Sequence, residues 1–228
     1  MKIVGIITNH TQISVIIKNK KYLDMVEVRV DYLLNKKISL DSVKKILIDI
    51  KKQVKLPLIL TVRLNKDGGK YPVDDKNRAA IIRSLAGYAD YVDIEINSKY
   101  LDLLYKWITT GKHKINLILS YHNFNQLPEL SKLKQLYLKS IKYKPYTVKF
   151  AVTVNKFKSL SKLITFRNWI KSNKSNVPAT IIPMSEKWFG SIGRVLFPLL
   201  GSELSYGCID KQVAPGQLNI RDLHKLLH

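Results

Sequence analysis

The sequence predicts a single (β/α)8 barrel that extends over residues 1–228. Eight short runs of β-branched and apolar residues alternate along the chain with longer segments of helical character. Eight strands that are each followed by a helix, in a chain of 228 residues, fit a barrel near its lower size limit. A doubly wound sheet is the structural alternative. The expected strands are residues 3–8, 25–29, 56–63, 91–96, 115–122, 147–154, 179–185 and 204–209.

The helical segments are predicted from the spacing of their apolar residues. In two of them, apolar side chains recur at steps that place them on one face of a helix, ready to pack against a sheet. These side chains are Val43, Ile46, Leu47, Ile50 and Val54 in the first segment, and Leu130, Leu133, Tyr137 and Ile141 in the second. Because 46% of the residues are apolar, the chain can bury a real core, which excludes a disordered chain.

Polar side chains in five of the expected strands fall on alternate positions. Alternate residues of a strand point to opposite faces, and in a barrel one of these faces is the lumen. We therefore expect charged side chains to converge inside the barrel near the C-terminal ends of the strands, where barrel active sites lie. A charged plug that only fills the lumen is the alternative. The residues concerned are Glu27, Arg29, Arg63, Asp93, Glu95, His122 and Lys149.

The net charge of +22 arises from 39 Lys and Arg residues against 17 Asp and Glu residues. The basic residues are scattered in ones and twos, and neither a long basic block nor zinc-finger spacing occurs in the sequence. We therefore expect a solvated basic surface that attracts anionic ligands, without nucleic acid as a partner. The sequence also lacks the His-Glu-x-x-His pattern and a cysteine cluster, so no metal site is expected.

The single cysteine and the hydropathy predict a cytoplasmic protein. Cys208 has no second cysteine to pair with, which fits a reducing compartment. The apolar run at residues 3–7 is too short for a signal-peptide core, and no run approaches the 18 or so residues of a membrane span. We expect no membrane association.

Two of the expected lumen residues have features of their own. Lys149 is the only lysine within a run that is predicted to be a buried strand. Burial beside cations such as Arg29 and Arg63 favours the neutral, nucleophilic form of a lysine amine. His122 ends an apolar strand and can act as an acid or a base near neutral pH.

Seven stretches spread over the whole chain resemble the type I 3-dehydroquinate dehydratases. The 27-residue step from His122 to Lys149 and the ten-residue step from Met184 to Arg194 also agree with that family. The stretches are Glu27-Val28-Arg29-Val30-Asp31, Thr61-Val62-Arg63 with Gly68-Gly69, Asp93-Ile94-Glu95, Ser120-Tyr121-His122-Asn123-Phe124, Val148-Lys149-Phe150-Ala151-Val152, Met184-Ser185 with Arg194, and Ala214-Pro215-Gly216-Gln217.

This resemblance implies a lyase of the shikimate pathway of aromatic amino acid biosynthesis. It would dehydrate 3-dehydroquinate to 3-dehydroshikimate through a Schiff base on Lys149, with His122 as the general acid and base, and without a cofactor or metal. The resemblance also implies that Arg194, in the loop and first helical turn after the seventh strand, binds the substrate carboxylate. Family members are typically homodimers. The other residues implied to contact substrate are Glu27, Arg29, Arg63 and Gln217.

Three positions depart from the family pattern, and one of them is Gly5, near which the family commonly has serine. Asp67 stands where the family usually has the glutamate that assists the histidine, so the shorter side chain puts the strength of this assistance in question. Val213 replaces a usual serine or threonine, which removes one polar contact to substrate. Two other functions stay open: another Schiff-base barrel enzyme resembling a class I aldolase, and a basic binding protein on a barrel scaffold that has lost catalysis.

Overall fold

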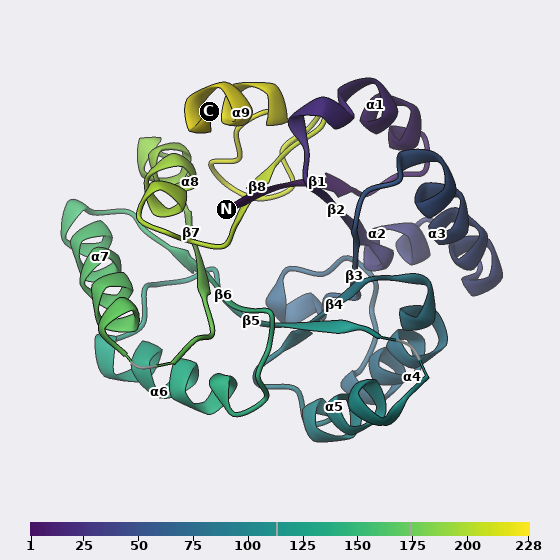
Figure 1. Cartoon of the computed structure of the whole chain (residues 1–228), viewed down its shortest axis with the longest axis horizontal. Helices are drawn as coiled ribbons and strands as arrows, with labels where there is room; N and C mark the ends of the chain where they lie inside the picture. The colour runs from purple at the N-terminus through teal and green to yellow at the C-terminus, as the bar shows by residue number, and fades with distance from the viewer. Residues whose placement is uncertain (113, 174) are drawn as a thin grey trace.

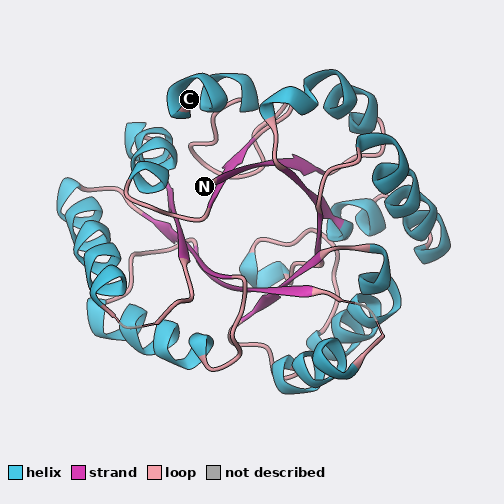
Figure 2. Cartoon of the chain, viewed as in Figure 1, coloured by secondary structure: helices cyan, strands magenta, loops and turns pink. Residues whose placement is uncertain are grey.

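The structure, a computed structural model, describes residues 1–112, 114–173 and 175–228. Its parallel strands form a ring that is surrounded by helices (Figures 1 and 2). Neighbouring strands follow the chain order from β1 to β7, and β8 returns to pair with β1. This order confirms the predicted (β/α)8 barrel and excludes the doubly wound alternative. The strands are β1 (Lys2–Ile7), β2 (Met25–Arg29), β3 (Leu58–Thr61), β4 (Tyr91–Glu95), β5 (Asn116–Asn123), β6 (Thr147–Thr153), β7 (Ala179–Met184) and β8 (Leu204–Gly207).

The helices cover the outer face of the ring of strands. Within the described residues, no helix is both long and apolar enough to cross a bilayer. The α-helices are α1 (Gln12–Asn19), α2 (Val30–Asn35), α3 (Leu40–Val54), α4 (Asp75–Leu85), α5 (Leu101–Thr110), α6 (Leu130–Ile141), α7 (Phe157–Ser172), α8 (Trp188–Leu199) and α9 (Ile220–Leu227). The short 3-10 helices are η1 (Lys20–Tyr22), η2 (Asn65–Asp67) and η3 (Ala86–Tyr88).

Helix α3 shows how the sequence builds the outer layer. Its apolar stripe is buried against the sheet, as the spacing predicts, while its lysines face outward. The Ser39 side chain accepts a hydrogen bond from the backbone N–H of Ser42 and so caps the first turn. Lys55 ends the helix in the left-handed conformation, with φ of 56°.

Strand β3 is shorter than the predicted run at residues 56–63. Pro57 has no N–H to donate to a ladder, although its carbonyl oxygen accepts a bond from the Val26 N–H. At the other end, the backbone N–H of Arg63 donates to the Asp31 carboxylate at 3.3 Å instead of to a strand. Arg63 therefore lies just beyond the sheet, where its side chain can turn into the mouth of the barrel.

Side chains close the seam between β7 and β8, where no strand ladder is formed. The Leu204 N–H donates to the Thr180 hydroxyl at 3.2 Å, and the Ile181 N–H donates to the Ser202 hydroxyl at 3.1 Å. One backbone bond, from the Glu203 N–H to the Ala179 carbonyl, completes the contact at 3.1 Å. These bonds keep the ring closed beside the strand that carries Tyr206.

The lumen is filled in two layers. An apolar cluster fills the part toward the N-terminal ends of the strands with Val4, Met25, Ile59 and Ile118, and it reaches the cavity at Ile182 and Met184. Polar and charged side chains lie above it, as the alternation in the sequence predicts. The register aligns Glu95 with Ser120, and Ser120 with Lys149, so consecutive strands present these groups at one level. The charged side chains thus form one layer beneath an open mouth rather than a plug through the whole lumen.

Candidate active site

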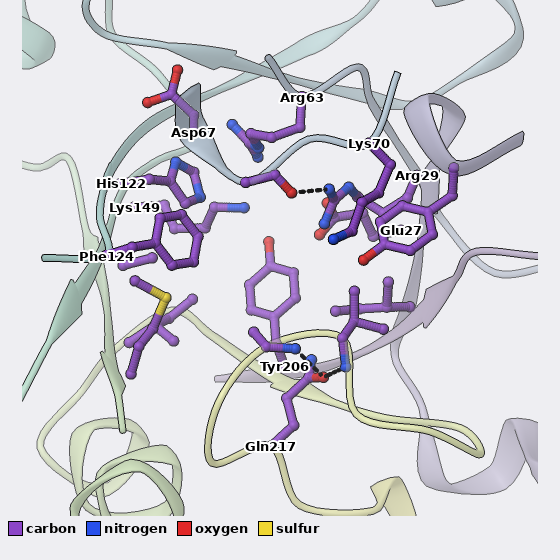
Figure 3. Close-up of a pocket in the computed structure, with 18 of the residues that line it drawn as sticks. Glu27, Arg29, Arg63, Asp67, Lys70, His122, Phe124, Lys149, Tyr206 and Gln217 are labelled. Atoms are coloured by element: carbon purple, nitrogen blue, oxygen red, sulfur yellow. Dashed lines mark hydrogen bonds between the residues drawn. The ribbon is translucent and has the colours of Figure 1, made fainter. Parts of the chain in front are cut away.

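A cavity of about 320 Å³ lies at the mouth of the barrel, above the charged layer (Figure 3). It is bounded by the C-terminal ends of strands and by the loops that follow them, which is where barrel enzymes carry their active sites. All eight site residues expected from the sequence line this one cavity. They are Glu27, Arg29, Arg63, Asp67, His122, Lys149, Arg194 and Gln217.

Lys149 lies at the floor of this cavity. It is the third residue of β6, points into the lumen, and is 3% exposed. Its ammonium forms an ion pair with Asp93 of β4 and lies over the ring of Tyr206, 4.7 Å from the centroid. The amine is therefore held by one carboxylate and one aromatic face, within reach of a ligand in the cavity.

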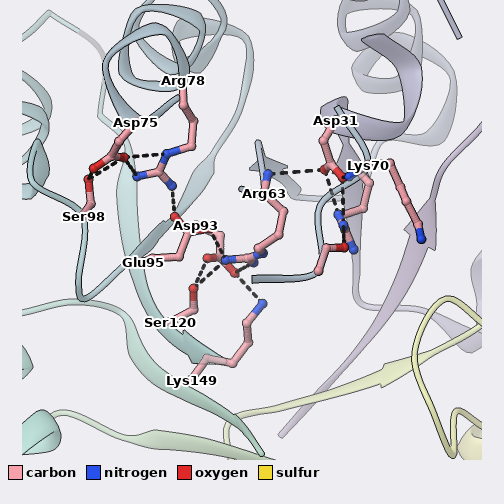
Figure 4. Close-up of polar contacts among 12 residues, drawn as sticks. Asp31, Arg63, Lys70, Asp75, Arg78, Asp93, Glu95, Ser98, Ser120 and Lys149 are labelled. Atoms are coloured by element: carbon pink, nitrogen blue, oxygen red, sulfur yellow. Dashed lines mark hydrogen bonds and ion pairs between the residues drawn. The ribbon is translucent and has the colours of Figure 1, made fainter. Parts of the chain in front are cut away.

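Arg63 is the hub of the charged layer (Figure 4). Its guanidinium pairs with Asp93 at 2.9 Å and with Glu95 at 2.8 Å, and it donates to the Ser120 hydroxyl at 2.8 Å. Ser120 in turn donates to Asp93 at 2.5 Å. Burial raises the pKa of Asp93, but Arg63 and Lys149 outweigh it, so the net pKa is lowered and the carboxylate stays charged.

The network of ion pairs extends from the strands to helix α4 through a fully buried arginine, Arg78. Arg78 forms ion pairs with Glu95 and, at 2.7 Å, with Asp75. Asp75 also accepts a bond from the Lys99 N–H at 2.7 Å, close to the surface. Charges therefore alternate in sign from the start of α4 to Lys149. The alternation in the strands did not reveal Arg78, because this residue reaches the network from a helix.

His122, the second-to-last residue of β5, faces the cavity. Burial, followed by Arg63 and Lys149, lowers the pKa of His122 well below its usual range, so the imidazole is neutral at neutral pH. Its ring is stacked with that of Phe124, with centroids 6.4 Å apart. The buried Nδ1 atom has no hydrogen-bond partner in the part of the chain that the structure describes. A neutral imidazole in this position can accept a proton.

Asp67 lies near His122 without bonding to it. The two residues line the main cavity and also share a neighbouring cavity of about 230 Å³. Burial raises the pKa of Asp67, although Arg63 and Lys66 act in the opposite direction. No hydrogen bond joins Asp67 to His122 among the described residues. Asp67 lies at the end of η2, and the His122 Nδ1 atom has no partner within the described residues.

Arg194 lies deeper in its helix than the sequence suggests. The prediction of a loop and first turn is wrong, because α8 already begins at Trp188 and Arg194 falls in its second turn. Its guanidinium donates to the carbonyl oxygens of Gly216 at 3.0 Å, Pro215 at 3.2 Å and Tyr206 at 3.4 Å. Burial lowers its pKa to about 10, so the side chain stays charged at neutral pH. Since an arginine has five N–H donors, two remain for an anionic ligand.

The loop after β8 is held closely against the start of α8. A Cβ on Gly190 would lie 2.5 Å from the Ser185 carbonyl oxygen and 2.9 Å from the Gly216 Cα, so only glycine fits there. The Gln217 side-chain oxygen accepts bonds from the N–H groups of Val213 at 2.6 Å and Ala214 at 3.1 Å. The Gln217 carbonyl group therefore shapes the loop, and its NH₂ group is the part that can donate to a ligand. Val213 presents only an apolar side chain to the cavity.

Arg29 anchors the opposite wall of the cavity. It forms a two-pronged ion pair with Asp31, with both N–O distances 2.9 Å, and it donates to the Gly68 carbonyl oxygen at 3.1 Å. Its guanidinium also lies 4.9 Å from the centroid of the Tyr32 ring. These contacts fix the loop that carries Asp67. Glu27, one step earlier on the lumen face of β2, is buried beside them.

Sequence reasoning missed several residues that line the cavity. Tyr206 could have been found by extending the alternation to the eighth strand, where it shares the lumen cluster with Leu204. Lys70 and Tyr32 carry no such periodic signal, because they lie in a loop and in the short helix α2. The missed side chains are Tyr32, Lys70, Phe124, Met184 and Tyr206.

These observations define a (β/α)8 barrel whose mouth holds a buried amine, a neutral imidazole and several cations. This combination suits chemistry on an anionic carbonyl compound. Over residues 1–112, 114–173 and 175–228, no group of three or more His, Cys, Asp or Glu side chains is arranged to hold a metal ion.

Comparison with known proteins identifies the family. The family model described as Type I 3-dehydroquinase matches residues 4–228. The 3-dehydroquinate dehydratase of Hydrogenobaculum sp. (strain Y04AAS1) is 32% identical over 226 residues, covering 99% of this chain and 97% of the relative. The chain therefore belongs to the type I 3-dehydroquinase family, as the motifs in its sequence indicate.

Solved structures agree with this assignment. The crystal structure of 3-dehydroquinate dehydratase from Aquifex aeolicus VF5 has a TM-score of 0.81 at 28% identity, covering 99% of this chain and 97% of that chain. The fold of the enzyme from Geobacillus kaustophilus HTA426 is also similar, with a TM-score of 0.87 at 20% identity and coverage of 99% of this chain and 89% of that chain.

The buried Arg78 provides a test of the charge network. Replacing it in Arg78→Met removes the buried cation shared by Glu95 and Asp75 and leaves Arg63 as the one ion-pair partner of Glu95 among the described residues, which should lower the free energy of unfolding by about 3–5 kcal/mol. Arg83→Met, at an exposed position on the same helix, should change it by no more than about 0.5 kcal/mol. Urea unfolding of both variants measures the difference. Equal stabilities would show that Arg78 is not needed to balance the network.

The lowered pKa of His122 predicts an acid-sensitive fold. The unfolded chain binds a proton at His122 below about pH 6.5, whereas the folded chain does not, so stability is present above this pH and is lost as the pH falls. The loss attributable to this group is at most about 1.4 kcal/mol per pH unit. Urea unfolding at pH 7.5 and pH 5.5 should show a smaller difference for His122→Gln than for the wild type or Arg83→Met. If the free energy of unfolding of His122→Gln changed between the two pH values as much as that of the wild type, His122 would not be the source of the acid sensitivity.

Proposed function

We propose that this family member is a hydro-lyase that dehydrates 3-dehydroquinate to 3-dehydroshikimate, in the shikimate pathway, through an imine on Lys149. The observation that carries this proposal is the meeting of Lys149 and His122 at one cavity that also contains Arg194. An amine, an acid-base group and a carboxylate-binding cation are the three groups that this dehydration needs. The names of the family relatives support the same reaction.

The first step is attack of the neutral Lys149 amine on the substrate ketone carbon. The carbonyl oxygen leaves as water, and the resulting imine carries a positive charge when it is protonated. Asp93 and the Tyr206 ring, which hold the lysine in the free protein, suit this charged nitrogen equally well. The cation on the nitrogen then makes the neighbouring CH₂ carbon acidic.

His122 then moves two protons. Its neutral imidazole removes a proton from the carbon beside the imine, which gives an enamine. The imidazolium donates that proton to the hydroxyl group one carbon further on, which leaves as water while a conjugated imine forms. Water hydrolyses this imine, so that 3-dehydroshikimate is released and the Lys149 amine is restored. The net change is loss of one water molecule.

The other cavity residues bind the substrate. Arg194, with two N–H donors remaining, binds the carboxylate, and the Gln217 NH₂ group donates to a substrate oxygen. Glu27, Arg29 and Arg63 surround the ring hydroxyl groups. The favoured ligand is thus a small anionic molecule, and nucleic acid is not a partner.

We also infer the setting in which the enzyme works. The family resemblance supports a homodimer. Cys208, the only cysteine in the sequence, is a buried free thiol, which supports the cytoplasm as the compartment. The proposed reaction uses neither a metal ion nor a cofactor.

Lysine trapping tests the proposed imine. When the enzyme is reduced with borohydride in the presence of 3-dehydroquinate, the mass of the adduct should appear on the peptide that contains Lys149. Lys149→Ala should lose both the adduct and nearly all formation of the ultraviolet-absorbing enone product. Lys70→Ala removes the other lysine that lines the cavity and should keep the adduct.

The possible results separate the alternatives. An adduct on Lys149 with a phosphorylated sugar, without turnover of 3-dehydroquinate, would favour an aldolase-like enzyme. Absence of any adduct and of any turnover would favour a binding protein that has lost catalysis.

Asp67 is proposed as the positioning carboxylate of His122, directly or through one water. A nearby carboxylate raises the pKa of a histidine, so Asp67→Asn should lower it and move the acid limb of the rate profile to lower pH. Turnover should fall about ten- to a thousandfold, because the change tunes the acid-base group without removing it. Asp67→Glu should retain the wild-type profile, and imine trapping should persist in both variants. Profiles of wild type and Asp67→Asn that superimpose in height and acid limb would make Asp67 only a loop residue.

A further inference from the structure

Tyr206 presents an unpaired hydroxyl group at the floor of the active-site cavity. The residue is 3% exposed, and its Oη atom is buried without a hydrogen-bond partner in the described part of the chain. Burial, followed by Glu27 and Asp93, raises the pKa of the phenol well above its usual range, so the group stays protonated. Tyr206 is therefore a neutral hydrogen-bond donor that nothing in the described protein uses.

Two other tyrosine hydroxyl groups do have partners. The Tyr137 hydroxyl donates to the Val177 carbonyl oxygen at 2.7 Å, and the Tyr146 hydroxyl donates to the Glu203 carboxylate. A buried hydroxyl group without a partner is unfavourable, and such groups in proteins call for a specific explanation. The exception in this barrel occurs at the cavity that holds the reactive lysine, which points to a ligand as the missing partner.

The direction of the side chain shows which part of a ligand it meets. Figure 3 shows the Tyr206 hydroxyl pointing into the cavity, with Lys149 and His122 on one side and Glu27 on the other. The Lys149 ammonium lies over the Tyr206 ring, 4.7 Å from its centroid, and Figure 3 draws the hydroxyl between Lys149 and Glu27. A ligand carbon attached to Lys149 would therefore have His122 on one flank and the Tyr206–Glu27 pair on the other.

We propose that the Tyr206 hydroxyl is a specificity-determining group that donates a hydrogen bond to the substrate hydroxyl on the carbon beside the imine, on the flank away from His122. This inference rests on the proposed function. In 3-dehydroquinate the ketone carbon has two neighbours, a CH₂ group and a carbon that bears a hydroxyl group. His122 must face the CH₂ group to remove its proton, so the hydroxyl faces Tyr206 and Glu27.

Tyr206 and Glu27 complement both the acceptor oxygen and the donor hydrogen of that substrate hydroxyl. Tyr206 donates to its oxygen atom, and the Glu27 carboxylate accepts its hydrogen atom, so every polar group at this point is satisfied. A site built in this way disfavours a ligand without the hydroxyl, because the phenol and the carboxylate would then stay unpaired. Tyr206 contributes the donor that the apolar Val213 on the same cavity does not.

Tyr206→Phe tests the hydroxyl alone, because the ring over which Lys149 lies is retained. For 3-dehydroquinate the KM should rise about three- to tenfold, as expected for one net neutral hydrogen bond, while kcat falls by less than about twofold. For 4-deoxy-3-dehydroquinate, which lacks the partner hydroxyl, the wild type and Tyr206→Phe should have the same KM. Tyr146→Phe, which removes a hydroxyl outside the cavity, should leave both substrates unaffected.

The results that would overturn the Tyr206 contact differ from those that would overturn the proposed function. An equal rise of KM for both substrates in Tyr206→Phe, or no rise for either, would overturn the assigned contact. A loss in kcat alone would also overturn it, because the hydroxyl would then act on the reaction rather than on recognition. Borohydride trapping on Lys149 should succeed in Tyr206→Phe, and its failure in the wild type would instead overturn the proposed function.

Discussion

The paired charges of Arg63 and Asp93 are the constraint on which the rest of the site depends. Asp93 is buried on β4, and a buried carboxylate is tolerated only when cations and hydrogen bonds surround it. Arg63 supplies one cation, Lys149 the other, and Ser120 a hydroxyl donor. Because these groups come from strands β4, β5 and β6 and from the second residue after β3, a slip of one residue in any strand would leave a buried charge unpaired. The charge pairing therefore enforces the same strand register that the apolar core favours.

The same network bears on two requirements that the proposed reaction places on Lys149. In that reaction the lysine attacks as a neutral amine and then carries a positive charge as an iminium ion. Asp93 pairs with the Lys149 side chain in the free protein, and the same carboxylate can pair with the charged nitrogen of the iminium ion. Burial lowers the pKa of His122 most, and Arg63 and Lys149 lower it further. Lys149 and His122 line one cavity and have different roles in the proposed reaction.

Much of this arrangement could be predicted from the sequence, because strand periodicity is a local property. Alternation predicted that Glu27, His122 and Lys149 share the lumen, and the structure places them at one cavity. Features that depend on contacts between distant elements could not be predicted in this way. Arg78 enters from a helix, α8 begins earlier than its glycines suggest, and the reach of Asp67 depends on how Arg29 fixes the loop beside it. Local pattern therefore indicates which face a side chain occupies, whereas tertiary packing decides whether it meets its partner.

The net positive charge of the protein includes cations that line the mouth of the barrel. Within the charged layer, acidic and basic groups alternate and nearly cancel, as burial requires. Above it, Arg194 and Lys70 line the cavity without a carboxylate as their direct ion-pair partner among the described residues. An anion that approaches the basic surface is therefore drawn toward cations that still have donors to offer. The excess of lysine on the outside and the balance of charge inside are two consequences of one electrostatic rule: unpaired cations remain where water or an anionic ligand can reach them.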